Sequence, residues 1–115
     1  MGVSLDRNLD RKSGSGHKDV RYTFTAAATK TDVVAGVSTK RIIADRLVVA
    51  NTTASAITVH MEDGGTEKGP TLQCPANDTT ETSSIVVFDA GAGLDVQSTG
   101  ACTVYLDYHR KAAGL

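Results

Sequence analysis

Apolar and polar side chains alternate with a two-residue period along most of the chain from Val20 onward, which is the pattern of strands with one face in a core. Near the carboxyl end, Cys102, Val104, Leu106 and Tyr108 fall on one face of such a strand. Gly, Asn, Asp and Ser clusters separate the alternating runs and mark turns. Eight strands are predicted, over residues 20–27, 31–37, 41–50, 56–61, 71–74, 84–88, 94–97 and 101–108.

The longest apolar run, RIIADRLVVA over residues 41–50, is compatible with two structures. Several of its apolar residues fall at near-helical spacing. However, Ile and Val dominate, no Ser/Thr-x-x-Glu cap precedes the run, and a turn follows it directly. We therefore predict a strand, in which Asp45 and Arg46 mark a bulge or an edge crossing.

The turn signals complete an all-β prediction. Residues 62–70, which contain Asp63-Gly64-Gly65, are expected to form an exposed loop, and residues 75–78 a turn. The spacing of the strands favours a single antiparallel β-sandwich or jelly-roll-like domain of about eight short strands. Composition agrees, with 15 Thr, 12 Val and 11 Gly, and a chain of 115 residues is too short for an α/β barrel or a doubly wound sheet.

The first 19 residues differ from the rest. Residues 1–19 have few apolar side chains and contain the flexible run Ser13-Gly14-Ser15-Gly16, so we expect an extended N-terminal arm followed by a sandwich domain over residues 20–115. Such an arm needs a partner surface in order to become ordered, and a neighbouring subunit is the simplest candidate.

Charge is distributed unevenly along the chain. The net charge is −1, but residues 1–19 carry +1, residues 20–49 carry +3 and residues 50–115 carry −5. This asymmetry suits head-to-tail contact between copies. No apolar run reaches the length of a membrane span and the chain begins without the apolar core of a signal peptide, so we expect neither a membrane partner nor secretion by its own signal.

Nucleic acid is not an expected partner. Overall there is no basic field, and only Tyr22 and Phe24 lie near the basic residues in the sequence. Those basic residues are Lys18, Arg21, Lys40, Arg41 and Arg46.

Histidine and carboxylate residues give two candidate pairs for chemistry. His60 and Glu62 share one strand face, as do Asp107 and His109, whereas His17 belongs to the arm and is not expected to be held rigidly. Either pair offers two groups for a metal site or for a base and its orienting partner, but neither supplies the third group that such sites need. We therefore predict no catalytic, cofactor-binding or metal-binding residues, no cofactor and no enzymatic activity. An enzyme would require the two pairs to meet in one cleft.

The remaining motifs are incomplete. Asp63-Gly64-Gly65 lacks the rest of a calcium loop, and Gly91-Ala92-Gly93 lacks the third glycine and the helix of a phosphate-binding loop. Cys74 and Cys102 are too few for a disulfide framework, and free buried thiols are favoured while a bond between them stays open.

Two further features have limited weight. The sequons at Asn51 and Asn77 arise by chance in a Thr-rich chain. Tyr105 is the one aromatic residue expected to face outward in the last strand, which leaves a glycan- or ligand-binding module as an alternative.

Residues 42–110 resemble small virion structural proteins of tailed bacteriophages. The similarity lies in an L-x-V-x-N-x-T strand and turn, an apolar-alternating strand, a Pro-initiated segment, a G-L-x-V strand and a final V-Y-L-x-Y-like strand. The matching positions are Leu47, Val49, Asn51, Thr53, Ile57, Val59, Pro75, Gly93, Leu94, Val96, Val104 and Tyr108.

This resemblance implies a head decoration (cement) protein or a small neck, tail or fibre-associated component, with no catalytic residues to carry over. On this interpretation the partners are other copies of the chain, in a trimer, and the major capsid protein or another virion protein. The expected location is the virion, assembled in the host cytoplasm.

Overall fold

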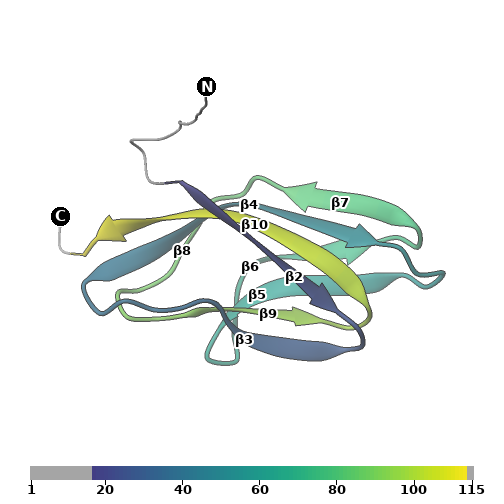
Figure 1. Ribbon diagram of the computed structural model, residues 1–115, viewed down its shortest axis with the longest axis horizontal. Helices are drawn as coiled ribbons and strands as arrows, with labels where there is room; N and C mark the ends of the chain where they lie inside the picture. Colours follow the sequence, from purple (N-terminus) through teal and green to yellow (C-terminus); the bar gives the residue numbers. More distant parts are fainter. Residues whose placement is uncertain (1–16, 114–115) are drawn as a thin grey trace, which may run out of the picture.

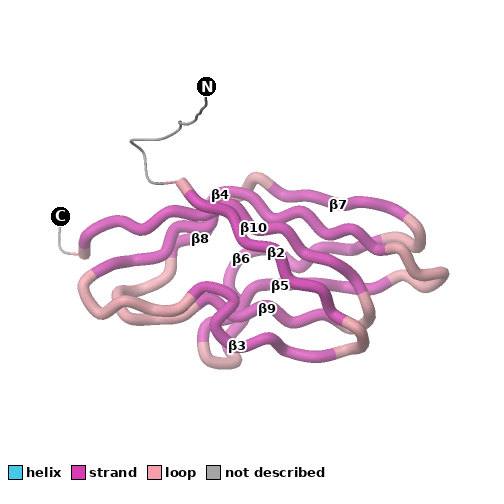
Figure 2. Tube along the Cα trace, in the orientation of Figure 1, coloured by secondary structure: helices cyan, strands magenta, loops and turns pink. Residues whose placement is uncertain are grey.

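The described part of the chain folds into two packed β-sheets without a helix (Figures 1 and 2). The computed structural model describes residues 17–113. Within this range, no helix is long and apolar enough to cross a membrane. The strands described there are β2 (Lys18–Phe24), β3 (Ala28–Val34), β4 (Lys40–Asn51), β5 (Ile57–Asp63), β6 (Thr66–Cys74), β7 (Asp78–Thr82), β8 (Val86–Val87), β9 (Leu94–Ser98) and β10 (Cys102–Ala112).

The order of the strands is that of a jelly roll. One sheet has the order β2-β10-β4-β7, with the short β8 also pairing with β4, and the other has the order β3-β9-β5-β6. Every pairing is antiparallel. Because the chain crosses repeatedly between the two sheets, strands adjacent in a sheet are mostly distant in sequence. The prediction of an all-β antiparallel sandwich with jelly-roll character is confirmed.

The inner faces of the two sheets form a single apolar core. Alternation along the strands places one side chain of every two between the sheets, as the sequence pattern predicted. Phe88 is the largest fully buried side chain, although it follows β8 rather than lying in a strand. The other core residues are Phe24, Val34, Ile42, Ala44, Leu47, Val49, Ile57, Val59, Met61, Leu72, Cys74, Val86, Leu94, Val96, Cys102, Val104 and Leu106.

A bulge interrupts the alternation in β4. Arg46 pairs with Asp107 of β10, but the next β10 residue, Tyr108, pairs with Ala44, so Asp45 is an extra residue on β4. Two successive side chains, Asp45 and Arg46, therefore point away from the core. This confirms the predicted bulge, and it explains why the apolar residues of a strand resemble a helical pattern.

The predicted loop over residues 62–70 is wrong. Glu62 and Asp63 complete β5, and β6 begins at Thr66, so the connection is the two-residue turn Gly64-Gly65. Both glycines have positive φ, at 57° and 93°, which a tight hairpin turn requires. The strand tolerates Pro70 because β6 is an edge strand and its pairing with β5 is irregular there.

β7 is the strand that the sequence did not predict. It pairs with β4 from Thr82 opposite Leu47 to Asp78 opposite Asn51. Its sequence, DTTET, has no apolar alternation, because this edge strand buries none of its side chains fully. Residues 84–88 reduce to the two-residue β8, which continues the same edge along β4.

The ends of the predicted strands also shift. β2 begins at Lys18, inside the predicted arm, and β10 continues to Ala112. Residues 1–16, which make up most of the predicted arm, lie outside the described residues.

Asn51 holds the corner where β4 ends. Its side chain is 1% exposed, and its Nδ2 donates to the carbonyl oxygens of Ser55 (2.9 Å), Cys74 (3.3 Å) and Pro75 (3.0 Å). Its Oδ1 accepts from the backbone nitrogen and the hydroxyl of Thr53, at 3.0 and 2.7 Å. These contacts tie the turn after β4 to the β6–β7 turn. The N-x-T positions of the phage-like pattern therefore have a structural role in this chain.

Cys74 and Cys102 are free and buried, as favoured from the sequence. Burial raises the pKa of both thiols, and the neighbouring Cys102 raises that of Cys74 further. A hydrogen bond from Thr80 opposes the shift of the Cys74 pKa, and one with Ser98 opposes that of Cys102.

Candidate functional site

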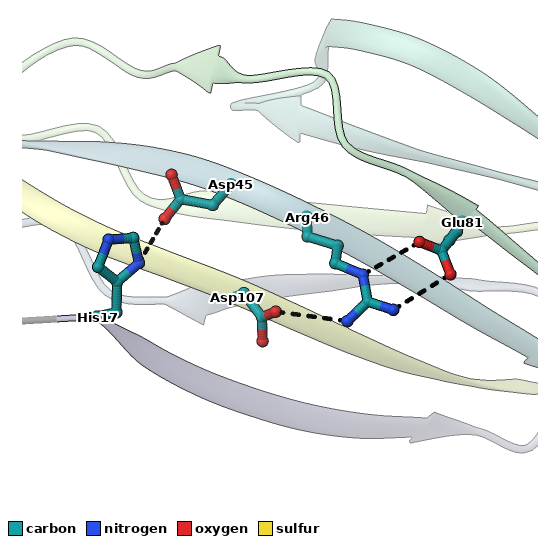
Figure 3. A network of polar contacts seen from close by, with 5 residues as sticks. All are labelled: His17, Asp45, Arg46, Glu81 and Asp107. Atoms are coloured by element: carbon teal, nitrogen blue, oxygen red, sulfur yellow. Dashed lines mark hydrogen bonds and ion pairs between the residues drawn. The ribbon is translucent and has the colours of Figure 1, made fainter. Parts of the chain in front are cut away.

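The outer face of the β2-β10-β4-β7 sheet carries the polar groups that gather from distant parts of the chain. We call it the network face and define it by the residues labelled in Figure 3 together with His109 and Tyr105. Figure 3 shows Asp45 and Arg46 on β4, Asp107 on β10 and His17 at the entry to β2. The strand alternation directs all of them away from the core, and the bulge in β4 supplies two of them in succession.

Arg46 is the centre of an ion-pair network on this face. Its Nε and one terminal nitrogen donate to the two carboxylate oxygens of Glu81 at 3.2 and 3.1 Å, and its other terminal nitrogen lies 3.8 Å from Asp107 (Figure 3). The hydrogen bond and charge of Arg46 lower the pKa of Glu81, and Glu81 in turn raises that of Arg46. Because these side chains are solvent-exposed, their ion pairs add little to the free energy of unfolding. The main effect of the network is to hold the charged groups in defined positions.

Asp45 gathers two histidines beside this network. Its Oδ2 lies 2.8 Å from Nδ1 of His109 and 3.2 Å from Nδ1 of His17. The two imidazole rings lie close together, with centroids 4.7 Å apart. His17 is therefore held in place, contrary to the prediction that it could not be. Asp107 and His109 were expected to pair with each other. Instead, His109 contacts Asp45 and Asp107 contacts Arg46.

Two adjoining hollows lie on the network face. One has a volume of about 480 Å³ and is lined by Tyr105, Arg21 and the Arg46–Asp107 pair, among others. The second, of about 420 Å³, contains His17 and Asp45. Tyr105 is 41% exposed and faces outward, as predicted. The face thus offers an aromatic ring and charges of both signs to a partner.

The other predicted pair, His60 and Glu62, forms on the opposite sheet. His60 Nε2 lies 2.7 Å from Glu62 Oε2, and the side chains are only 15% and 10% exposed. They lie on β5, whose core-facing residues are Ile57, Val59 and Met61, so the pair faces away from the core. It therefore cannot join the groups of β10 in one cleft, as the enzyme alternative required.

The remaining candidate residues have structural positions. Tyr22 packs edge-on against Phe24, with ring centroids 4.9 Å apart, and both contribute to the core rather than to a stacking surface. Asp63-Gly64-Gly65 forms the β5–β6 turn, and Gly91-Ala92-Gly93 lies in the loop before β9. Lys40 and Arg41 are exposed at the start of β4.

Sequence reasoning missed two residues of the network face as partners. Asp45 was noted only as a sign of a bulge, although a carboxylate inside a long apolar strand was itself a signal. Glu81 gave no signal because its strand was not predicted.

Comparisons with known proteins identify the fold but no family. No protein-family model matches the chain, and no curated protein matches it. Among solved structures, the nucleoplasmin-like N-terminal domain of Drosophila FKBP39 is similar at 11% identity and a TM-score of 0.52, covering 90% of this chain and 98% of that domain. A chain of the Bacillus endospore appendages, described as disulfide-linked pili, matches at 13% identity and a TM-score of 0.41, covering 89% of this chain and 97% of that one. At such identities, the first likeness concerns the fold alone.

Proposed function

We propose that this chain is a non-enzymatic structural protein of a tailed-bacteriophage virion, acting as a capsid decoration (cement) protein. In this proposal it binds neighbouring copies of itself, as a trimer, and the major capsid protein. The sandwich supplies a rigid body, and residues 1–16 contribute to the contact with a neighbour. Its place of action is the virion, assembled in the host cytoplasm.

The observation that carries the proposal is the position of His17 on the network face. The first described residue lies against Asp45 and His109, so the described part of the chain begins on a hollowed surface that presents charges of both signs. A surface of this kind suits specific contact with another protein, because paired charges fix orientation. An arm that adds contact area to such a face strengthens attachment without enlarging the domain.

Two further points support the virion assignment. The sequence resemblance covers residues 42–110, and several of its positions lie in the core or at the Asn51 corner. Jelly rolls recur in viral capsid domains, although they also occur in lectins and enzymes, so this second point is an analogy of fold.

Removal of residues 1–16 tests the role of the arm. We expect the shortened chain to keep its β-rich circular dichroism and its Tm while losing attachment to phage particles that lack the protein, measured by co-sedimentation. The control is His60→Ala, on the opposite sheet, which should attach as the full chain does. Full attachment by the shortened chain would contradict the proposal.

Copy number separates the cement role from a neck, tail or fibre role. A cement protein is present on the whole shell, whereas a neck or tail component is limited to the axis of the particle. Quantitative mass spectrometry of purified particles, calibrated against the major capsid protein, distinguishes the two.

A second candidate function is a glycan- or ligand-binding module. The hollow of about 480 Å³ beside Tyr105 favours it, because an outward aromatic ring flanked by charged groups can stack and orient a sugar. This candidate predicts that the isolated monomer binds on a glycan array and that Tyr105→Ala removes the signal. An array without signal would count against it and would leave the cement proposal unaffected.

A further inference from the structure

Three metal-ligating side chains from three separate parts of the chain converge on the network face. His17 precedes β2, Asp45 is the bulge residue of β4, and His109 lies on β10. Their ligand atoms all lie within 4.8 Å of one another. We propose that His17, Asp45 and His109 bind a divalent transition-metal ion, with Zn²⁺ as the representative case.

The distances fit a single small ion. Zinc binds imidazole nitrogen and carboxylate oxygen at about 2.0–2.2 Å, so two ligand atoms in a tetrahedral site lie roughly 3.3 Å apart. Asp45 Oδ2 lies 3.2 Å from His17 Nδ1 and 2.8 Å from His109 Nδ1. Only small side-chain movements are needed to bring the three ligands around one ion.

The donor set selects the class of metal. Two imidazoles and one carboxylate suit borderline ions such as Zn²⁺, Co²⁺, Ni²⁺ and Cu²⁺. Ca²⁺ and Mg²⁺ prefer sites made of oxygen ligands, so they are expected to bind poorly. The three protein ligands leave a fourth position for water or for a group of a partner, on the side of the hollow of about 420 Å³.

The charges around the hollow are compatible with a bound cation. Lys18 and Arg46 line it, but Asp19, Asp45 and Asp107 line it as well. The charge of Arg46 is further compensated by its paired hydrogen bonds to Glu81, outside the hollow. Acidic groups thus outnumber basic ones near the ligands, which favours a divalent ion.

A bound ion would connect the entry of β2 to the two central strands of the sheet. β10 pairs with both β2 and β4, so the three strands that carry or follow the ligand residues lie side by side (Figure 1). Because His17 precedes β2, the ion would hold the start of the described chain against β4 and β10. This role does not depend on whether the partner is a virion protein.

The test uses the full chain without a polyhistidine tag, dialysed against EDTA and then against metal-free buffer. Titration with ZnCl₂ in a calorimeter should give one site per chain, and CoCl₂ should produce visible absorption from ligand-bound Co²⁺. His17→Ala, Asp45→Asn and His109→Ala should each weaken Zn²⁺ binding by about 100-fold or more, since the loss of even an outer-shell partner costs roughly 10- to 100-fold. The matched control is His60→Ala. It also removes a histidine that is paired with a carboxylate, but among the described residues the His60–Glu62 pair has no third metal-ligating group beside it.

Thermal melts in metal-free buffer show whether each variant is folded. His17→Ala is the most informative, because His17 precedes β2 and does not belong to the core. The proposal is overturned if the full chain binds no Zn²⁺ at one-to-one stoichiometry, if His17→Ala binds as tightly as the unchanged chain, or if His60→Ala loses binding equally.

Discussion

The middle and the carboxyl end of β4 place polar residues in the same apolar strand with opposite results. Asn51 points inward, is 1% exposed and bonds to backbone carbonyls and to Thr53. Asp45 points outward from the bulge and contacts two histidines that come from opposite ends of the described chain. In the sequence both are simply polar interruptions of a run of Ile, Leu and Val.

The difference shows that the face of the strand on which a polar residue lies decides its role. A residue on the inner face stabilises the fold, and a residue on the outer face is available to bind a partner. Asn51 points toward the core like Leu47 and Val49. Its amide must therefore form hydrogen bonds with buried polar groups, and its role is to stabilise the fold. The bulge turns Asp45 out beside Arg46, where its partners are side chains at a hollow rather than backbone groups. The four predictions below test this division, beginning with the largest expected effect.

Substitution of Asn51 by Ala should cause the largest loss of stability. It leaves the carbonyl oxygens of Cys74 and Pro75 without their donor, and we expect a cost of about 2–4 kcal/mol in the free energy of unfolding. Urea unfolding measures it, and Tm should fall by about 10 °C or more. The control is Asn77→Gly, at the exposed second sequon, where Gly accommodates the positive φ of 55° and little change is expected. Equal effects of the two substitutions would contradict a structural role for Asn51.

Alkaline pH should lower the stability of the fold through the buried thiols of Cys74, at the end of β6, and Cys102, at the start of β10. The pKa of Cys74 and of Cys102 is raised in the folded chain, so the unfolded chain loses its thiol protons first as pH rises. This contribution is fully present below the unfolded pKa of about 8.5 and is lost as pH rises through the raised folded pKa.

Unfolding in urea across this pH range measures the decrease. The double variant Cys74→Ala, Cys102→Ala has no thiols and should show a shallower slope, whatever its absolute stability. An unchanged slope would mean that other groups cause the alkaline loss.

Substitution of Asp45 by Asn should have a small effect on the fold. The residue is partly exposed, and Asn keeps an oxygen that accepts a hydrogen bond from His109, so the expected cost is below about 1 kcal/mol. The same variant is expected to lose Zn²⁺ binding. A loss of stability comparable to that of Asn51→Ala would remove the distinction between the bulge residue Asp45 and the end residue Asn51.

Acid should produce the smallest effect, through the Arg46–Glu81 pair. The pKa of Glu81 is lowered in the folded chain, so its contribution to stability is present above the unfolded pKa and is lost as pH falls through the folded pKa. Because both side chains are exposed, added salt should reduce the contribution further. Comparing the pH dependence of Glu81→Gln with that of the unchanged chain, at low and high salt, isolates it. A salt-independent difference would contradict an exposed ion pair.

Much of the fold could be predicted because the relevant signals are local. The two-residue period found seven of the nine strands over most of their lengths, and Ile and Val distinguished the strand β4 from a helix. β7 was missed because an edge strand of Asp, Thr and Glu buries too little to show a period. The β5–β6 hairpin was taken for a loop because Gly and Pro signals do not reveal that an edge strand can continue through an irregular pairing.

The candidate site was harder to predict than the fold. His60 and Glu62 are two residues apart on one strand, so their contact followed from strand geometry alone. The same rule paired Asp107 with His109 and was wrong, because each residue found a closer partner on β4. Adjacency within a strand predicts which face a side chain occupies, but not which neighbour across the sheet it contacts.

The sequence by itself determined that this chain forms an antiparallel β-sandwich, since periodicity and residue type depend only on neighbours along the chain. It favoured free buried thiols but left a bond between Cys74 and Cys102 open, and the structure shows both to be free. The tertiary structure decided that β2, β4 and β10 lie side by side, and that the extra residue in β4 turns Asp45 toward His17 and His109. The physical reason is that the jelly roll pairs strands distant in sequence. The groups that meet on the network face are therefore set by pairing register, which no local pattern specifies.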